Sequence, residues 1–259
     1  MKIVAWEDFA AGDRTAGPFA AAIGVFDGIH LGHRELIGRI LGRPDLASVV
    51  VTFNENPKRS LHGSAFRGDI LTMRQRAEII ESLGVDIIVL IDFSGDFVKL
   101  PGRKFLSLLS ESGDLRFLAV GHDFRCGHRL DTGAEEIRDF CAERGIEVDF
   151  LRAVRVAEHP VSSSRIRMAV IEGRLEEAAS LMGRPFELDL RAADADGAGR
   201  MRPTGGQAAP PDGIYEALAV RRGEAAQTEA VLRDGAWELR PGTKEPPETL
   251  RLLRMVSRE

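Results

Sequence analysis

The sequence predicts an α/β fold with a parallel sheet, followed by a small, mostly antiparallel β module. Between residue 19 and about residue 154, near-continuous apolar segments alternate with segments of helical periodicity. This alternation is typical of parallel strands that helices cover on both faces. Beyond Pro185, residues 191–213 are rich in Gly, Ala, Pro and Asp, and short strand-like segments separated by turn signals follow them. Turns at that spacing favour antiparallel strands.

Five apolar segments of the first part are predicted strands: residues 19–23, 47–53, 86–93, 115–120 and 147–154. Helices are expected between them. The first carries Leu36, Ile37, Ile40 and Leu41 on one face. The second covers residues 72–83, where Thr72 and Gln75 form a capping box and Gly84 ends the helix. A third covers residues 104–110. A capping box of Thr132 and Glu135 is expected to open a fourth helix, which ends at Arg144.

The remaining elements are shorter. Residues 161–183 are predicted to form two helices, of which Ser162–Ser164 can cap the first. Strands are expected at 214–220, 230–232 and 237–239. We place the domains at residues 1–186 and 187–259, because the composition changes beyond Pro185.

Composition excludes several classes of protein. A chain of 259 residues with 44% hydrophobic residues can fill a sizeable core, and a net charge of −5 argues against nucleic-acid or anionic-membrane partners. The two cysteines, Cys126 and Cys141, form no CxxC pair, which fits a reducing compartment. The mixed N-terminus is not typical of a signal peptide, and no apolar run reaches membrane-spanning length. We therefore expect a cytoplasmic protein.

The most informative segment is Gly24–His33, which follows an apolar strand and precedes a helix. His30 and His33 lie three residues apart, at the start of that helix. The first N–H groups of a helix are unpaired and the helix dipole is positive there, so this position favours anions. Glycines let the backbone come close to a ligand, and three occur here: Gly24, Gly28 and Gly32. The pattern predicts a polyphosphate site.

Two other interpretations of the histidines stay open at this point. They could be capping or surface residues, or they could share a metal with a further ligand. His122, Cys126 and His128 are candidates for that ligand by residue type. The glycine pattern and the strand-to-helix position favour phosphate. In parallel sheets ligands bind at the carboxyl ends of strands, and three loops follow predicted strands there: 24–33, 54–57 and 121–129.

The loop resembles the nucleotide-binding signature of the nucleotidylyltransferase superfamily, His-x-Gly-His. More closely, the chain resembles the bacterial FAD synthetase family, which is usually fused to riboflavin kinase. Four further segments match in order, and the resemblance covers roughly residues 19–186: Val51–Pro57, Gly121–Gly127, Val161–Arg167 and Leu181–Phe186. It implies a Rossmann-like parallel sheet of the nucleotidylyltransferase type.

The resemblance also implies adenylyl transfer: the phosphate of FMN attacks the α-phosphate of ATP, giving FAD and pyrophosphate. The nucleophile is already an anion, so catalysis needs positioning and charge stabilisation rather than a protein nucleophile. Mg²⁺ is expected to accompany ATP. The implied catalytic residues are His30, His33, Ser163, Ser164 and Arg167. The implied nucleotide-binding residues are Gly24, Val25, Phe26, Asp27, Gly32, Gly121 and Ser162, with Asp27 also a candidate for a metal contact. The implied flavin-binding residues are Phe53, Asn56, Pro57, Asp123, Phe124 and Arg125.

The chain also departs from the family pattern. Asn56 stands where the family has histidine, and Cys126 stands where it has an aromatic residue. In the C-terminal part, Gly197–Arg200, Pro203–Gly206 and Pro211–Tyr215 resemble kinase motifs only faintly; Thr204 is present without its asparagine, and Glu229 lacks matching neighbours. We therefore expect a reduced module without riboflavin kinase activity. Two alternatives are an enzyme for another phosphate acceptor and a catalytically weak flavin- or nucleotide-binding protein.

Overall fold

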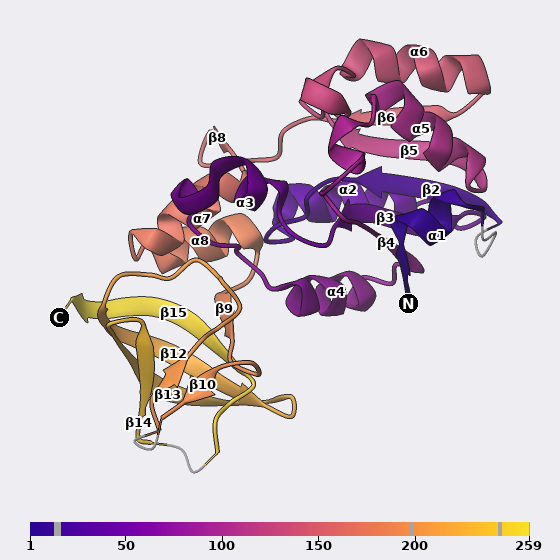
Figure 1. Cartoon of the computed structure of the whole chain (residues 1–259). Helices are drawn as coiled ribbons and strands as arrows, with labels where there is room; N and C mark the ends of the chain where they lie inside the picture. Colours follow the sequence, from indigo (N-terminus) through magenta and orange to yellow (C-terminus); the bar gives the residue numbers. More distant parts are fainter. Residues whose placement is uncertain (13–16, 197–198, 243–244, 259) are drawn as a thin grey trace. The chain divides into compact units, whose positions relative to one another are not determined.

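The computed structural model describes residues 1–12, 17–196, 199–242 and 245–258 (Figure 1). It divides into two compact units. The first unit contains residues 1–26, 32–61 and 77–154, and the second contains residues 27–31, 62–76 and 155–259. Within the described ranges, no helix has the length and apolar character that crossing a bilayer requires.

The first unit is built on a six-stranded parallel sheet. Its strands are β1 (Lys2–Ala5), β2 (Pro18–Ile23), β3 (Ala47–Phe53), β4 (Ile87–Ile91), β5 (Asp114–Gly121) and β6 (Glu147–Leu151). They lie in the order β1-β4-β3-β2-β5-β6. The chain therefore runs outward from β2 through β3 to β4, and then in the opposite direction from β5 to β6. The direction reverses between β2 and β5, and this is where such sheets bind ligands, at the carboxyl ends of the strands.

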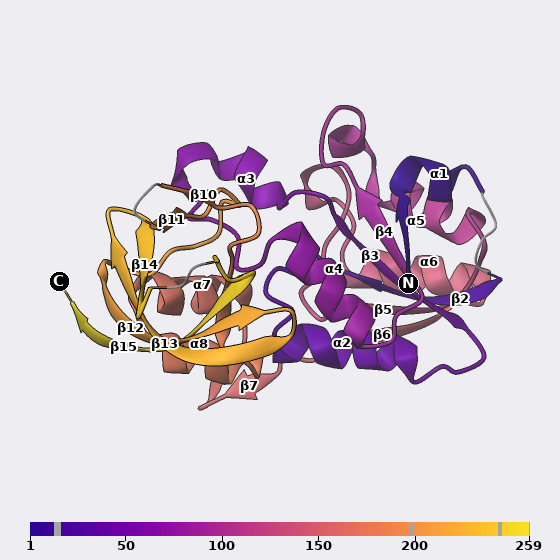
Figure 2. The same ribbon diagram turned by 90° about the horizontal axis from the view of Figure 1, so that it is seen from below.

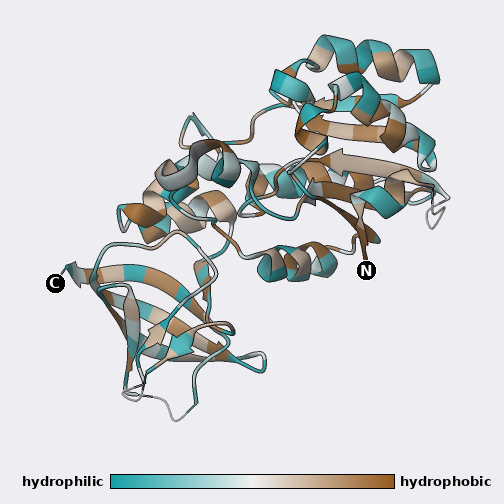
Figure 3. Ribbon diagram, in the orientation of Figure 1, coloured by the Kyte–Doolittle hydropathy of each residue, from teal (hydrophilic) through white to brown (hydrophobic). Residues whose placement is uncertain are grey.

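The helices that accompany these strands are α1 (Trp6–Ala10), α2 (Leu31–Leu41), α3 (Pro57–His62), α4 (Met73–Ser82), α5 (Gly102–Glu111) and α6 (Ala134–Arg144). One face of the sheet packs against α1, α5 and α6 through a buried cluster that includes Trp6, Phe105 and Phe140. Crossovers of one hand then put α2 and α4 on the opposite face, because those connections run the other way along the sheet. Figure 3 shows this amphipathic design: β5 is largely hydrophobic, whereas much of α6 is hydrophilic.

The second unit contains two helices and an antiparallel β module. The helices are α7 (Ser163–Ile171) and α8 (Leu175–Met182), preceded by a hairpin of β7 (Arg155–Val156) and β8 (His159–Pro160). The module is a seven-stranded sheet, whose long strands are strongly curved (Figure 2). Its strands are β9 (Phe186–Asp189), β10 (Asp194–Ala195), β11 (Met201–Arg202), β12 (Gly213–Arg221), β13 (Glu224–Arg233), β14 (Ala236–Arg240) and β15 (Thr249–Arg258). Tyr215 and Trp237 are fully buried at its centre, with ring centroids 5.5 Å apart.

The fold class predicted from sequence is confirmed, and so is the capping box of α4. The Thr72 N–H donates to Gln75 Oε1 at 3.0 Å, and the Gln75 N–H donates to Thr72 Oγ1 at 3.3 Å. The second predicted capping box was wrong. Gly133, not Thr132, precedes α6, and its N–H donates to Glu136 Oε2 at 2.8 Å, so Glu136 plays the part expected of Glu135.

Several elements were not predicted, and they are mostly short or at an edge. The helices and strands concerned are β1, α1, α3, β7, β8, β9, β10, β11 and β15. The predicted domain boundary between residues 186 and 187 stays a prediction. Of the expected kinase-like echo Gly197–Arg200, Gly197 and Ala198 lie outside the described residues.

Candidate functional site

Hydrogen bonds to β3 hold the start of the 24–33 loop, where the chain leaves β2. The Gly24 N–H donates to the Val51 carbonyl at 3.2 Å, and Thr52 Oγ1 donates to the Val25 carbonyl at 3.0 Å. Both partners belong to the neighbouring strand β3, so the start of the loop is fixed to the sheet. A Cβ added at Gly24 would lie 3.3 Å from the Phe26 ring, a tight contact that would require the ring to shift by a few tenths of an ångström.

The loop then adopts a conformation that L-residues rarely take. Phe26, Gly28 and Ile29 have φ values of 51°, 89° and 38°. Left-handed backbone is unusual for a bulky residue and more so for a β-branched one, and it persists only where the surroundings enforce it. Here burial enforces it, because the side chains of Phe26 and Ile29 are completely buried. Strain of this kind concentrates at functional sites.

The two predicted histidines lie in different surroundings. His33 is the third residue of α2, and its ring lies 5.1 Å from the Phe26 ring, centroid to centroid. His30 directly precedes α2 and is 7% exposed. Burial, assisted by the positive charge of Arg184, lowers the pKa of His30 from 6.5 to about 4. His30 is therefore neutral at physiological pH and can act as a hydrogen-bond donor without carrying charge.

Asp27 is buried and is held by the protein on both carboxylate oxygens. Oδ1 accepts the Ile70 N–H at 2.8 Å, and Oδ2 pairs with the guanidinium of Arg167. Burial raises the pKa of Asp27, while the charge of Arg167 acts in the opposite direction. These contacts favour a structural role for Asp27, although the resemblance implies a contact with the nucleotide or a metal.

Arg167, on α7, is also committed to contacts within the second unit. Its Nε donates to the Gly68 carbonyl at 2.7 Å, and its guanidinium carbon lies 5.2 Å from the centre of the Phe66 ring. With 7% of its surface exposed, it holds the 24–33 loop and the 66–68 segment together. Arg165 has a different environment, because it pairs with Glu177 at 2.9 Å.

The three serines at the start of α7 have different environments. Ser162 caps the helix, since its Oγ accepts the Arg165 N–H at 3.2 Å. Ser163 Oγ donates to the Asp27 carbonyl at 2.8 Å. A hydroxyl has one proton, so Ser163 cannot also donate to a phosphate while it keeps this bond. Ser164 is exposed in the first turn of the helix. The backbone N–H groups of that turn are therefore the better phosphate donors.

One residue of the loop environment was missed in the search for site residues. Arg184 donates to the Gly28 carbonyl at 2.6 Å and to the Ile29 carbonyl at 3.0 Å. It thereby fixes the two peptide units that precede His30. The signal that could have found Arg184 is the segment Leu181–Phe186, which matches the family pattern and contains this arginine.

The predicted flavin-binding residues all lie in the first unit, after β3 and β5. Asn56 is buried and precedes α3, and its Oδ1 accepts the Lys58 N–H at 3.1 Å. Pro57 opens α3, a position that suits proline because the first helical N–H needs no partner. Phe53 ends β3 and packs edge-on against Phe93, with centroids 5.6 Å apart.

The loop after β5 begins with a turn in which the Phe124 N–H donates to the Gly121 carbonyl at 3.0 Å. Phe124 packs against the core of the first unit, whereas Asp123 and Arg125 are exposed. Arg125 Nε donates to the Leu130 carbonyl at 2.9 Å. The loop therefore offers one apolar side chain and two accessible charged ones of opposite sign.

A metal centre finds no support in the described part of the chain, where no group of three His, Cys, Asp or Glu side chains is arranged to hold an ion. Burial raises the pKa of Cys126 to about 12, so its thiol is protonated rather than a ready ligand. The His128 Nδ1 lies 3.0 Å from the Val98 carbonyl. Among the described residues no such cluster is arranged for a resident ion, and Mg²⁺ is expected to come with ATP as part of the substrate.

The parallel sheet, with its loops at the point where strand order reverses, defines an α/β protein of the type that binds ligands at strand carboxyl ends. The chain belongs to the FAD synthetase family, whose model matches residues 13–165, more than half of its length.

Curated relatives agree with this family assignment, and one solved structure shares the fold. A bifunctional riboflavin kinase/FMN adenylyltransferase of Buchnera aphidicola (subsp. Schizaphis graminum) is 27% identical over 186 residues, covering 70% of this chain and 60% of the relative. A protein of the same description from Listeria monocytogenes is 30% identical over 183 residues, covering 69% of this chain and 58% of the relative. The match thus spans about three fifths of these relatives' length. The crystal structure of a macrolide-efflux protein from Streptococcus pneumoniae matches with a TM-score of 0.85 at 24% identity, covering 100% of this chain and 92% of that one. That likeness concerns the fold alone.

Proposed function

We propose that this protein is an FMN adenylyltransferase, which transfers AMP from ATP to FMN and releases pyrophosphate. The observation that carries the proposal is the 24–33 loop. It combines left-handed backbone at buried residues, a neutral buried histidine and the start of α2, next to the point where strand order reverses. The membership of the chain in the FAD synthetase family also supports adenylyl transfer.

In this reaction an oxygen of the FMN phosphate attacks the α-phosphorus of ATP. The bond from the α-phosphorus to the bridging oxygen breaks, and Mg-pyrophosphate leaves. Negative charge on the non-bridging and leaving oxygens must be stabilised as this happens. We assign His30 and His33 to donate to those oxygens. His30 suits this role because a neutral imidazole keeps one N–H donor and one acceptor fixed.

The triphosphate also needs donors that are already oriented. We assign backbone N–H groups of the 24–33 loop and of the first turn of α7 to this task, with Ser164 as the serine whose exposure suits it best. Asp27, Arg167 and Ser163 then act by holding that backbone in place. We assign Arg167 and Ser163 to positioning rather than to phosphate contact, because their described hydrogen bonds go to the protein.

We assign flavin binding to Phe53, Asn56, Pro57, Asp123, Phe124 and Arg125. The aromatic side chains offer apolar surface to the ring system, and Arg125 offers a cation for the FMN phosphate. Asn56 can hydrogen-bond but carries no positive charge, in contrast to a protonated histidine.

We further propose that the β module has no riboflavin kinase activity. Two features of the segment 203–206 support this. The hydroxyl of Thr204 donates to the Ala192 carbonyl, and the Gly206 carbonyl accepts the Asp69 N–H at 3.0 Å. Glu229 lies in an ordinary ladder position of β13 and within 3.5 Å of Arg240, an arrangement that suits a structural ion pair.

The test is to incubate purified protein with ATP and Mg²⁺ plus either FMN or riboflavin, and to separate the flavins chromatographically. FAD from FMN, and no FMN from riboflavin, are expected. His33→Ala should reduce FAD formation by about a hundredfold or more, as expected for loss of a donor to a developing oxyanion. His128→Ala is the matched control, because the described hydrogen bonds of this exposed side chain go only to the Val98 carbonyl. Flavin binding without any product would favour a binding protein instead.

A further inference from the structure

The segment Gly68–Ile70, here called the strap, lies between the 24–33 loop and the β module in the second unit. On one side it contacts the module: the Asp69 N–H donates to the Gly206 carbonyl at 3.0 Å, and the Ala208 N–H donates to the Asp69 carbonyl at 2.7 Å. These bonds form a short parallel bridge between Asp69 and Gln207. The strap is thereby attached to the module through its backbone.

On its other side the strap holds the loop. The Ile70 N–H donates to Asp27 Oδ1 at 2.8 Å, and the Gly68 carbonyl accepts from Arg167, which also pairs with Asp27. Ile70 is completely buried, and a Cβ at Gly28 would lie only 3.1 Å from its Cδ1. The loop therefore rests on the strap by hydrogen bonds and by van der Waals contact.

The close approach of strap and module requires glycine at position 68. Gly68 has a φ of +89°, and a Cβ there would lie 2.6 Å from the Ala208 nitrogen and 2.7 Å from the Gln207 carbonyl carbon. Real Cβ atoms do not approach backbone so closely, so any side chain at this position would push the strap away from the module.

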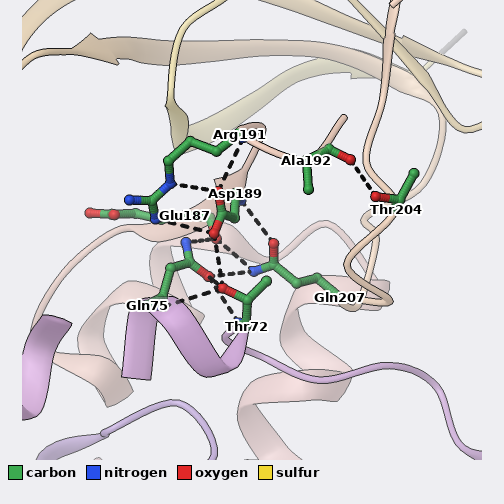
Figure 4. Close-up of polar contacts among 8 residues, drawn as sticks. All are labelled: Thr72, Gln75, Glu187, Asp189, Arg191, Ala192, Thr204 and Gln207. Carbon is green, nitrogen blue, oxygen red and sulfur yellow. Dashed lines mark hydrogen bonds and ion pairs between the residues drawn. The ribbon is translucent and has the colours of Figure 1, made fainter. Parts of the chain in front are cut away.

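The side chain of Gln207 completes the connection. Figure 4 shows its contacts with Gln75, Glu187 and Asp189. Its Nε2 lies within hydrogen-bonding distance of the carbonyls of Ile70 and Glu187, at 3.0 and 2.9 Å, and of Gln75 Oε1 at 3.1 Å. Its Oε1 accepts the Asp189 N–H at 2.8 Å. Ile70 of the strap thus accepts from Gln207 through its carbonyl and donates to Asp27 through its N–H.

We propose that the β module positions the nucleotide-binding loop through the strap, with Gln207 and Gly68 as its positioning residues. The module then contributes to adenylyl transfer without any kinase chemistry of its own. This inference rests on the proposed function, because it concerns how tightly the 24–33 loop binds the triphosphate.

The test compares two strap variants with two controls. Gln207→Met keeps the size of the side chain but removes its amide, and Gly68→Ala forces strap and module apart. Thr204→Val removes a module hydrogen bond that does not reach the strap. Gly84→Ala controls for backbone strain alone, since Gly84 has a φ of +90° with nothing within 4 Å of the added Cβ. Binding of MgATP is measured by calorimetry, binding of FMN by quenching of its fluorescence, and folding by circular dichroism.

Gln207→Met and Gly68→Ala should weaken MgATP binding by about tenfold, in the range of typical coupling between sites, while FMN binding stays at the wild-type value. The two controls should bind both ligands as the wild type does. Wild-type MgATP affinity in a folded Gln207→Met protein would overturn the proposal. Equal loss of MgATP and FMN binding would overturn it as well, because the residue would then support the fold as a whole. If the wild type binds MgATP but forms no FAD, the proposed function fails, and the binding comparison still decides this inference.

Discussion

Asp27 and Arg167 form a buried ion pair between residues 140 positions apart in the chain, with side chains only 5% and 9% exposed. The pair joins the 24–33 loop to α7, and Arg167 extends the connection to the Gly68 carbonyl. A loop that contains left-handed Phe26 and Ile29 needs such external support.

This pair should show strong coupling in a double-mutant cycle. Arg167→Met should lower the free energy of unfolding by about 3–5 kcal/mol, because it leaves a buried carboxylate without its partner. Asp27→Asn should destabilise the protein too, since it leaves the guanidinium unbalanced. The double variant should lose clearly less than the sum of the two, as measured by urea denaturation. Additive losses would mean that the two side chains do not interact in solution.

His30 should make stability depend on pH. Its pKa is about 4 in the folded protein and 6.5 in an exposed histidine, so the unfolded chain binds more protons between these values. Stability is therefore complete above pH 6.5 and falls as the pH is lowered from 6.5 towards 4, by at most about 3 kcal/mol for this group. His30→Gln, which does not titrate, should remove this part of the pH dependence. If the stability of His30→Gln depended on pH as strongly as that of the wild type, His30 would not be the group responsible. Nuclear magnetic resonance titration of the His30 ring measures its pKa directly.

The sequence predicted what depends on local pattern. The apolar run at residues 47–53 matches β3 residue for residue, and Thr72 with Gln75 forms the expected cap. Short elements with mixed polarity were missed: Lys2–Ala5 is largely exposed and forms a strand only by pairing with β4.

The same limit applies to the candidate site. The motifs identified the loop, His30 and the start of α7, because glycine and histidine patterns are local. They could not reveal that Arg167 and Ser163 bond to Asp27, or that Arg184 fixes Gly28 and Ile29, because those contacts join segments more than 130 residues apart in sequence. Side-chain type alone suggested phosphate contact for Arg167, and only tertiary structure supplied its protein partners.

Arg184 should affect catalysis through the loop. Arg184→Met removes the donors to the carbonyls of Gly28 and Ile29, so the loop should lose its geometry and FAD formation should fall by about ten- to a hundredfold. The pKa of His30 should rise as well, because the charge of Arg184 lowers it in the wild type. Arg202→Met is a matched control, since Arg202 makes a similar bond to the Asp234 carbonyl elsewhere in the β module. Equal rates of FAD formation by the two variants would show that Arg184 does not position the loop.

Asn56 should contribute to stability as a helix cap. Its Oδ1 accepts the Lys58 N–H at the start of α3, so Asn56→Ala should lower the free energy of unfolding by about 1 kcal/mol. Asn56→Asp retains the acceptor and should recover most of that loss in urea denaturation. If Asn56→Ala left the free energy of unfolding unchanged, α3 would not depend on this cap.

Transfer of the adenylyl group can be followed by the position of a radioactive label. Protein is incubated with FMN, Mg²⁺ and ATP radiolabelled at its α-phosphorus, and in parallel with riboflavin and ATP radiolabelled at its γ-phosphorus. We expect the α label in FAD and no γ label in FMN. Unlabelled flavin in the first reaction would contradict adenylyl transfer, and labelled FMN in the second would contradict the loss of kinase activity.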